Sequence, residues 1–363
     1  MHFPTETSEI QNRISLISPE KYASSRNYVD GSVTYLSPYI SRGVISTRDV
    51  FDHLQSLDLP WYKIEKLVQE LAWRDYWQQI WIAKGEEINS DLRNIQSNVA
   101  NHEVPKAIIE ARTGIEVVDR AINELYETGY MHNHMRMYVA SICCNIARSH
   151  WLEPAKWLYA HLLDGDLASN QLSWQWVAGA FSNKKYVANQ DNINKYFHSD
   201  QKNTFLDVDY SEFEALSIPE ILHDTAPFEL STPLPAIDLS ILSSEKPTLL
   251  YNYYNLDPEW HANEDHQRVV LFEPSFFSKN PVKQNCIDFV FKLIKNIPDA
   301  KIFIGEFSEL LKHIHAEHIV YKEHPSNGHY QGKEEPRDWL SGVTGYYPSF
   351  FKFWKKCKKE LKP

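Results

Sequence analysis

The chain has 363 residues, of which 43% are hydrophobic, and its formal net charge is −11. This length is enough for two domains that each bury a core of their own. The hydrophobic share is ordinary for a globular protein, and no apolar run is long enough to span a membrane. The net negative charge argues against a protein that coats nucleic acid non-specifically. It is compatible with a local basic groove on an otherwise acidic surface.

The residues from Met1 to Thr7 lack the basic and apolar stretches of a secretory signal. None of the four cysteines belongs to a C-x-x-C pair, and their spacing fits neither a zinc site nor an iron–sulfur cluster. We therefore expect a cytoplasmic protein with reduced thiols, no metal site and no contact with a membrane.

Residues 1–200 show the periodicity of helices. Long patterns without proline or glycine run through Glu65–Trp81 and Glu116–Tyr126, and two more predicted helices cover Met131–His150 and Pro154–Leu163. Residues 201–245 are rich in acidic residues, serine and proline, which predicts a linker or an arm that wraps around its neighbour.

From residue 246 the pattern changes to short apolar runs that alternate with helical stretches. The predicted strands are 248–253, 268–272, 300–304 and 318–321, and the predicted helices between the last three are 284–297 and 307–315. This alternation predicts a small parallel α/β domain over residues 246–363, without a G-x-G-x-x-G or P-loop motif. Phe350–Lys362 predicts a basic amphipathic helix, interpreted as a solvated cap rather than as a membrane or nucleic-acid contact.

Thirteen residues, Asp164 to Trp176, gather two carboxylates, a carboxamide and two indoles. Asp166, Asn170 and Trp174 are four residues apart, so a helix would place them on one face. An acid, an amide and an indole make a poor core face. They are well suited to the wall of a site for a planar aromatic ligand that forms hydrogen bonds.

A second segment places Asn133, Arg136 and Met137 on one helical face. An arginine on a partly buried face needs an acidic partner, because an unpaired buried charge is very costly. Asp164 is the natural candidate. Taken alone, however, this segment fits an ordinary helix with one ion pair.

Glu70, Trp73 and Arg74 belong to a third segment, whose face continues to Trp77 and Trp81. An aromatic core stripe with a surface ion pair is the simpler interpretation of that face alone. In a fourth segment the hydroxyls from Thr34 to Ser37 precede a helix, where they can cap it or hold a phosphate.

Taken together, these segments resemble the FAD-binding domain of the photolyase/cryptochrome family. The matching stretches follow the family's order from about Tyr22 to Trp176. They are L-S-P-Y…G-V-I-S, E-L-x-W-R-D, T-G-x-x-V-V-D-R-A-I, M-H-N-x-x-R-M-x-V-A-S and D-G-D-L-A-S-N-x-x-x-W-Q-W. The resemblance implies an all-helical photolyase-type FAD-binding domain in residues 1–200, followed by the small α/β domain. This order is permuted relative to the family, and no antenna chromophore is expected.

The resemblance also implies which residues contact FAD. Thr34 and Ser37, with Tyr22, would hold the phosphates and the ribityl chain. Arg136 and Asp164 would form an ion pair beside the isoalloxazine.

Asp166 would bond to the edge of the flavin ring, and Asn170 would lie by its N5 atom. Trp174 and Trp151 match the first two tryptophans of the family's electron relay. The third position falls near Asn98, and the candidates for an alternative exit are Trp157, Tyr159 and Trp81.

The repair enzymes of the family flip a pyrimidine dimer out of DNA into a pocket over the flavin. Trp73 and Trp176 match the two indoles that pack on the dimer. Glu70 and Asn133 match the groups that form hydrogen bonds with it, and Met137 matches a nearby contact. Asn133 and Met137 stand where enzymes for (6-4) lesions carry histidines, which favours a cyclobutane dimer.

The implied function is FAD-dependent, blue-light-driven repair of cyclobutane pyrimidine dimers in single- or double-stranded DNA, by electron transfer from reduced flavin. Lys184 and Lys185 would be phosphate contacts or part of a solvated loop. The alternative is a cryptochrome-like flavoprotein that senses blue light or redox state and signals to a protein partner without repair. A third hypothesis is a helical protein without flavin.

Overall fold

The computed structural model describes residues 2–235 and 242–362. Contacts group the chain into two compact units that are both discontinuous in sequence. Unit 1 comprises Met1–Pro19, Thr34–Ala83 and Leu230–Pro363, and unit 2 comprises Glu20–Val33 and Lys84–Glu229. This grouping does not follow the predicted linear order, because residues 34–83 fall with the α/β segment. Residues 236–241 of the predicted linker lie outside the described residues.

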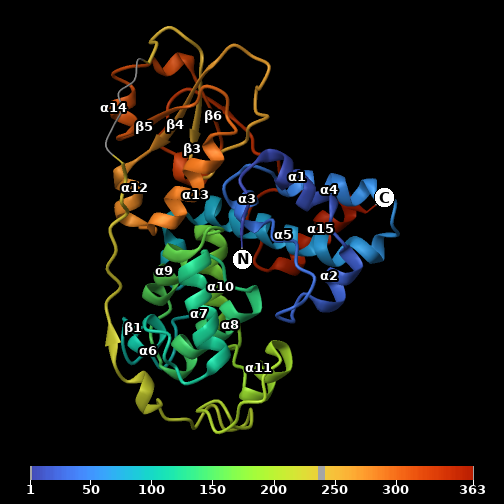
Figure 1. The fold of residues 1–363 in the computed structure, drawn as a ribbon, viewed down its shortest axis with the longest axis vertical. Coiled ribbons are helices and arrows are strands. Elements are labelled where there is room, and N and C mark those ends of the chain that lie inside the picture. Colours follow the sequence, from blue (N-terminus) through green and yellow to red (C-terminus); the bar gives the residue numbers. More distant parts are fainter. Residues whose placement is uncertain (1, 236–241, 363) are drawn as a thin grey trace. The chain divides into compact units, whose positions relative to one another are not determined.

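A five-stranded parallel sheet is the centre of the α/β part of unit 1 (Figure 1). Its strands, in spatial order, are β5 (Lys301–Ile304), β4 (Gln267–Phe272), β3 (Thr248–Asn252), β6 (Ile319–Lys322) and β7 (Lys333–Glu335). β3 and β4 are buried along their whole lengths, as expected for strands covered on both faces. The predicted combination of helices with a parallel α/β domain is confirmed.

Three helices connect or flank these strands, and they are α12 (Pro274–Lys279), α13 (Gln284–Ile294) and α14 (Phe307–Leu310). α13 buries Ile287, Val290 and Leu293, which are spaced three residues apart along one face. Glu306 and Glu309 form a capping box at the start of α14. Both α13 and α14 end before the ends expected from sequence, because the chain beyond them continues as isolated turns.

The remaining helices of unit 1 are α1 (Thr7–Ser15), α3 (Ser37–Ser41), α4 (Thr47–Ser56), α5 (Trp61–Lys84) and α15 (Phe350–Leu361). Asp75 of α5 is buried and joins three segments of this unit. Its Oδ1 accepts a hydrogen bond from the Thr47 hydroxyl (3.0 Å), and its Oδ2 accepts one from the backbone N–H of Leu340 (2.8 Å). Burial raises the pKa of Asp75 to about 6.

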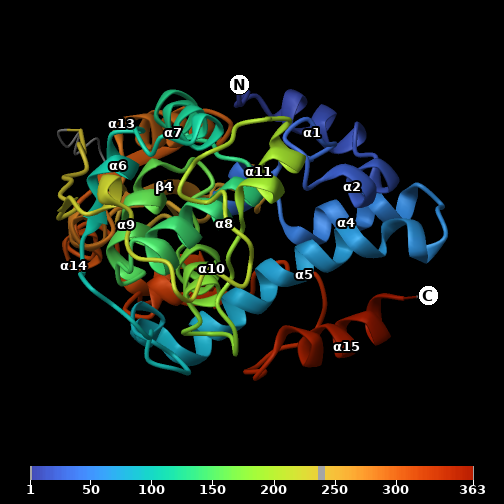
Figure 2. The same ribbon diagram turned by 90° about the horizontal axis from the view of Figure 1, so that it is seen from below.

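The C-terminal helix α15 lies alongside α5 (Figure 2). The apolar face of α15 is packed inside unit 1, because Phe350, Phe353 and Trp354 are buried, whereas a solvated cap was expected. Trp354 stacks on Trp61 with ring centroids 6.5 Å apart. The lysines on the opposite side, such as Lys355, are exposed, so the predicted basic amphipathic helix is confirmed.

Unit 2 is mainly helical. Its elements are α2 (Pro19–Ser25), which begins at the boundary with unit 1, the 3-10 turn η1 (Gly85–Asn89), α6 (Lys106–Ile109), α7 (Glu116–Thr128), α8 (Asn133–Ser141), the π-helical turn η2 (Ile142–Ile146), α9 (Leu152–His161), α10 (Leu167–Ala178) and α11 (Gln190–Phe197). Its core includes Ile122, Tyr138 and Trp157. The single helix expected over 131–150 is wrong: α8 passes into a π turn, and Arg148 has a positive φ of 55° that ends the helical run.

Residues 201–229, from the predicted linker or arm, are part of unit 2. The short strand β2 (Thr225–Ala226) pairs antiparallel with β1 (Val104–Pro105), and Phe205, Phe213 and Phe228 pack on the unit 2 core. In residues 2–235 and 242–362, no helix combines the length and the apolarity that a bilayer span requires.

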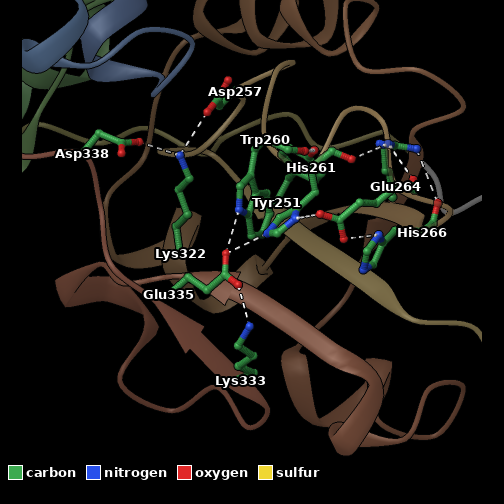
Figure 3. Close-up of polar contacts among 11 residues, drawn as sticks. Tyr251, Asp257, Trp260, His261, Glu264, His266, Lys322, Lys333, Glu335 and Asp338 are labelled. Carbon is green, nitrogen blue, oxygen red and sulfur yellow. Dashed lines mark hydrogen bonds and ion pairs between the residues drawn. The ribbon is translucent and has the colours of Figure 1, made fainter.

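A polar network ties the loop after β3 to the end of β7 (Figure 3). Glu335 accepts a hydrogen bond from Trp260 Nε1 (3.1 Å) and contacts His261 Nε2 (2.9 Å) and Lys333 Nζ (2.9 Å). The other ring nitrogen of His261 lies 2.6 Å from Glu264. Burial alone would raise the pKa of Glu335, but its hydrogen-bonding partners lower it to about 2. Hydrogen bonds to Glu264 and Glu335 raise the pKa of His261.

His261 should make the stability of the protein depend on pH. Because its pKa is raised on folding, its stabilising contribution is complete below the unfolded-state value of about 6.5 and is lost as the pH rises through the folded-state value. His261→Gln should therefore lower the melting temperature more at about pH 5.5 than at about pH 8.5. The exposed His313→Gln is the control, and an equal loss at both pH values for His261→Gln would contradict this role.

Candidate functional site

The helical face predicted for Asp166, Asn170 and Trp174 is formed by α10 of unit 2. Asp166 is the N-cap residue of α10, and its Oδ1 accepts a hydrogen bond from Ser169 N (2.7 Å). Asn170 and Trp174 follow at one-turn intervals and are both buried. Two polar side chains and an indole are thus held inside the unit on one side of a single helix.

Asn170 has one hydrogen-bonding group unused. Its Nδ2 donates to the carbonyl oxygen of Ala155 (2.8 Å) and to Gln171 Oε1 (2.9 Å), which fixes the orientation of the amide. Within the described residues its Oδ1 makes no hydrogen bond, so this oxygen can accept one from a ring N–H of a ligand.

The expected ion pair between Arg136 and Asp164 is present. Arg136 Nη2 lies 3.0 and 2.9 Å from the two carboxylate oxygens, and Nε donates to the backbone carbonyl of Met131 (2.8 Å). The side chains are only 20% and 5% exposed. Removing either partner would leave a poorly solvated charge, which typically costs about 3–5 kcal/mol for a buried pair.

The start of α8 is fixed by a neutral histidine. His132 is the N-cap residue, and its Nδ1 accepts a hydrogen bond from the backbone N–H of His134 (3.2 Å). Burial lowers the pKa of His132 to about 4, so the ring can serve as an acceptor at neutral pH. This cap leaves Asn133 exposed and Met137 half-buried, each one helical turn or less from Arg136.

The residues expected to hold phosphates divide between the units. Tyr22 of unit 2 is half-buried, and the guanidinium of Arg26 lies 6.0 Å from its ring centroid. In unit 1, Thr34 Oγ1 accepts a hydrogen bond from Leu36 N (3.4 Å), which closes a local turn. Ser37 begins α3 and is half-buried, and no side-chain cap is formed at that end.

Trp73 in unit 1 has one ring face covered by the C-terminal helix. Its ring stacks on Phe350 of α15 with centroids 3.7 Å apart and an interplanar angle of 8°. Glu70, one turn earlier, pairs with Lys66 (2.9 Å). Trp73 thus packs against α15 within unit 1, and the ion pair of Glu70 is formed with Lys66.

The remaining predicted substrate residues belong to unit 2. Trp176 is 37% exposed at the end of α10, with its ring 5.9 Å from that of Tyr186. Lys185 donates to the carbonyl oxygen of Ser97 (3.1 Å), and burial lowers its pKa. Lys184 is exposed. Of the two lysines, Lys184 is the one whose amine is more open to solvent.

Asp91 was not predicted from the sequence. The fully buried Trp151 donates a hydrogen bond from Nε1 to Asp91 Oδ1 over 2.6 Å. Asp91 lies in a polar loop without periodicity. The only sequence signal was indirect: a buried indole N–H requires a partner that the flanking residues do not supply.

These groups define what unit 2 can bind. A guanidinium–carboxylate pair, a free amide oxygen and neighbouring indoles suit a planar, hydrogen-bonding redox ring rather than a metal. Within residues 2–235 and 242–362, no three His, Cys, Asp or Glu side chains are placed to hold a metal ion.

Comparisons with known proteins also point to a flavin-binding domain. Residues 67–229 match the family model described as the FAD binding domain of DNA photolyase. The chain is 30% identical over 147 residues to a deoxyribodipyrimidine photo-lyase of Alkalihalophilus pseudofirmus and 33% identical over 145 residues to that of Streptomyces griseus. These matches cover 39% and 40% of this chain and 30% and 31% of the relatives, so the chain spans about a third of their length.

Cryptochrome-2 of Arabidopsis thaliana is 28% identical to the chain over 182 residues, covering 47% of this chain and 30% of the relative. Photolyases and a cryptochrome therefore match the same chain.

Proposed function

The chain belongs to the photolyase/cryptochrome family through its residues 67–229, and from that premise we propose that it is a light-driven enzyme that repairs cyclobutane pyrimidine dimers in DNA. FAD is the cofactor of this family domain. The observation that carries the proposal is the buried polar set of unit 2, in which the Arg136–Asp164 pair accompanies the free Oδ1 of Asn170.

These residues fit a flavin. The unused oxygen of Asn170 is an acceptor for a ring N–H, and the ion pair provides a fixed dipole in a poorly solvated place, where electrostatic effects are strong. Asp166, whose Oδ1 caps α10, is the proposed contact with the edge of the flavin ring. When bound, FAD supplies the light-driven transfer of one electron to the dimer and takes it back.

The chain's own residues bind and orient the lesion in this proposal. Trp176 and Trp73 are stacking platforms, each worth about 1–3 kcal/mol per base. Asn133 and Glu70 supply hydrogen bonds to the flipped bases, and Met137 supplies a contact. Support comes from the exposure of Trp176 and Asn133 within unit 2.

Phe350 bears on this assignment because it already occupies one face of Trp73. A dimer that uses this face must displace the ring of Phe350, whereas a dimer that uses only Trp176 need not. Of the two lysines, the exposed Lys184 is the better candidate for a contact with a DNA phosphate. The proposed substrate is UV-damaged DNA, and the proposed location of the protein is the cytoplasm.

The second candidate is a cryptochrome-like flavoprotein that senses blue light or redox state without repair. The stacked Phe350 and the net charge of −11 favour it, because neither promotes access of DNA to Trp73. The similarity to cryptochrome-2 is consistent with this alternative.

The purified protein should be yellow with bound FAD. The double variant Arg136→Ala/Asp164→Ala, which leaves no buried charge unpaired, should bind FAD at least about tenfold more weakly, since a hydrogen bond to a charged group contributes about 1.5–3 kcal/mol. Arg120→Ala, on the exposed side of α7, is the control. A colourless protein that cannot be reconstituted with FAD would contradict both candidate functions.

Light should restore thymine absorbance in a dimer-containing oligonucleotide when the flavin is reduced. Trp73→Ala/Trp176→Ala should reduce this repair by at least about thirtyfold while FAD stays bound, because two stacking platforms of about 1–3 kcal/mol each are lost. Trp61→Ala, which also removes an α5 indole stacked on α15, is the control. Undiminished repair in the double variant would refute the assigned platforms, and no repair by the wild type would favour the sensor.

Phe350→Ala should tighten binding of the dimer-containing oligonucleotide if Trp73 is a platform. Releasing an aromatic pair worth about 0.5–1.5 kcal/mol predicts a gain in affinity of about two- to tenfold, measured by fluorescence anisotropy in the dark. Phe351→Ala, whose side chain is exposed, is the matched control. Unchanged affinity together with lower thermal stability would show that Phe350 only fills the core.

A further inference from the structure

The indole of Trp151 is enclosed by protein, yet its ring nitrogen contacts a carboxylate. Trp151 is 0% exposed, and its Nε1 donates to Asp91 Oδ1 over 2.6 Å. Water does not reach a fully buried N–H, so Asp91 is the group to which this indole can pass its proton. A short hydrogen bond to a carboxylate is the geometry that such a transfer requires.

Gln96 fixes the positions of Trp151 and Asp91 relative to each other. Asp91 Oδ2 accepts a hydrogen bond from Gln96 N (2.8 Å), and Gln96 Oε1 accepts one from Trp151 N (2.9 Å). Gln96 is itself buried and donates to the backbone carbonyl of Ser149 (2.9 Å). The donor and the acceptor therefore keep their geometry without rearrangement.

Two imidazoles continue from Asp91 to the surface. His150 Nε2 lies 3.4 Å from Asp91 Oδ1, and the His150 ring stacks on the exposed His102 with centroids 5.0 Å apart. Burial lowers the pKa of His150 despite the neighbouring carboxylate of Asp91, and its Nδ1 accepts a hydrogen bond from Leu152 N (3.4 Å), so the neutral ring presents its Nε2–H to Asp91.

Trp157, another candidate exit from the electron relay, lacks such a base. Its Nε1 donates to the hydroxyl of Tyr126 (3.1 Å), which in turn donates to the carbonyl oxygen of Ile109 (2.7 Å). Burial raises the pKa of Tyr126 to about 12, so no phenolate forms at neutral pH, and the oxygen of a neutral phenol is a far weaker base than a carboxylate. The loop that carries Asp91 also carries Asn98, near the expected third relay position.

We propose that Asp91 is the proton acceptor of Trp151 and makes Trp151 the end of the electron relay; this inference rests on the proposed flavin function. Photoexcited flavin is the oxidant: one electron leaves Trp151 through Trp174 to the flavin. The indole that has lost an electron is a much stronger acid, and its Nε1 proton moves to Asp91 Oδ1. The products are a neutral indolyl radical and a neutral carboxylic acid. With the proton gone, return of the electron is slowed and the flavin stays reduced.

The test follows the two forms of the tryptophan radical by transient absorption after a laser flash on the FAD-loaded protein. The protonated and neutral radicals have different visible spectra. In the wild type the neutral form should appear, whereas in Asp91→Asn its formation should be about a hundredfold slower, at the lower end of what a positioned proton acceptor contributes. Asp91→Glu retains a carboxylate and should restore most of the rate.

Two controls separate this role from a structural one. Thermal unfolding of the flavin-free variants reports whether Asp91→Asn and Asp91→Glu are folded to the same extent. Trp157→Phe should leave the neutral radical unchanged, and Trp151→Phe should abolish it. If Asp91→Asn forms the neutral radical as fast as the wild type, or if Trp151→Phe still forms it, the inference is overturned while the flavin function stands. A wild type that binds FAD without forming any tryptophan radical overturns the relay itself and leaves the FAD-binding assignment intact.

Discussion

The Arg136–Asp164 ion pair is the constraint on which the interpretation of unit 2 depends. Two opposite charges that are mostly withdrawn from water are tolerated only because they meet at 2.9–3.0 Å. Their contact joins the middle of α8 to the chain just before α10, where Asp166 caps the helix. One turn into α10, Asn170 has its amide N–H groups hydrogen-bonded and its amide oxygen unused. A polar interior of this kind is costly for a domain that binds nothing and is well suited to one that binds a flavin.

Aromatic side chains occupy three different environments in this chain, and their types alone do not separate them. Trp61 and Trp73 stack on rings of α15 and stabilise unit 1. Trp176 remains partly open to solvent, as a stacking surface requires. Trp151 is enclosed, and its ring N–H donates a hydrogen bond to Asp91, its proposed proton acceptor. Partner and exposure, rather than residue type, decide the role of each indole.

Distant parts of the sequence are joined within unit 1 by a few specific contacts. Asp75 accepts from Thr47 and from the backbone N–H of Leu340, so the acid of one helix orders a segment 265 residues further along the chain. The stack of Phe350 on Trp73 does the same for α15. The C-terminal helix is therefore part of the packing around α5. The stack of Phe350 on Trp73 bears on whether the protein repairs DNA or signals, and a single substitution of Phe350 removes this contact.

The sequence by itself determined the helices, the parallel sheet and the stripe from Asp166 to Trp174, because periodicity and capping are local properties of the chain. It also indicated the Arg136–Asp164 pair, since a buried guanidinium must be neutralised. Only the tertiary structure decided that Phe350 covers Trp73, that α8 ends in a π turn, and that Asp91 bonds to Trp151. These contacts join residues distant in sequence or depend on side-chain packing, and no local pattern encodes them.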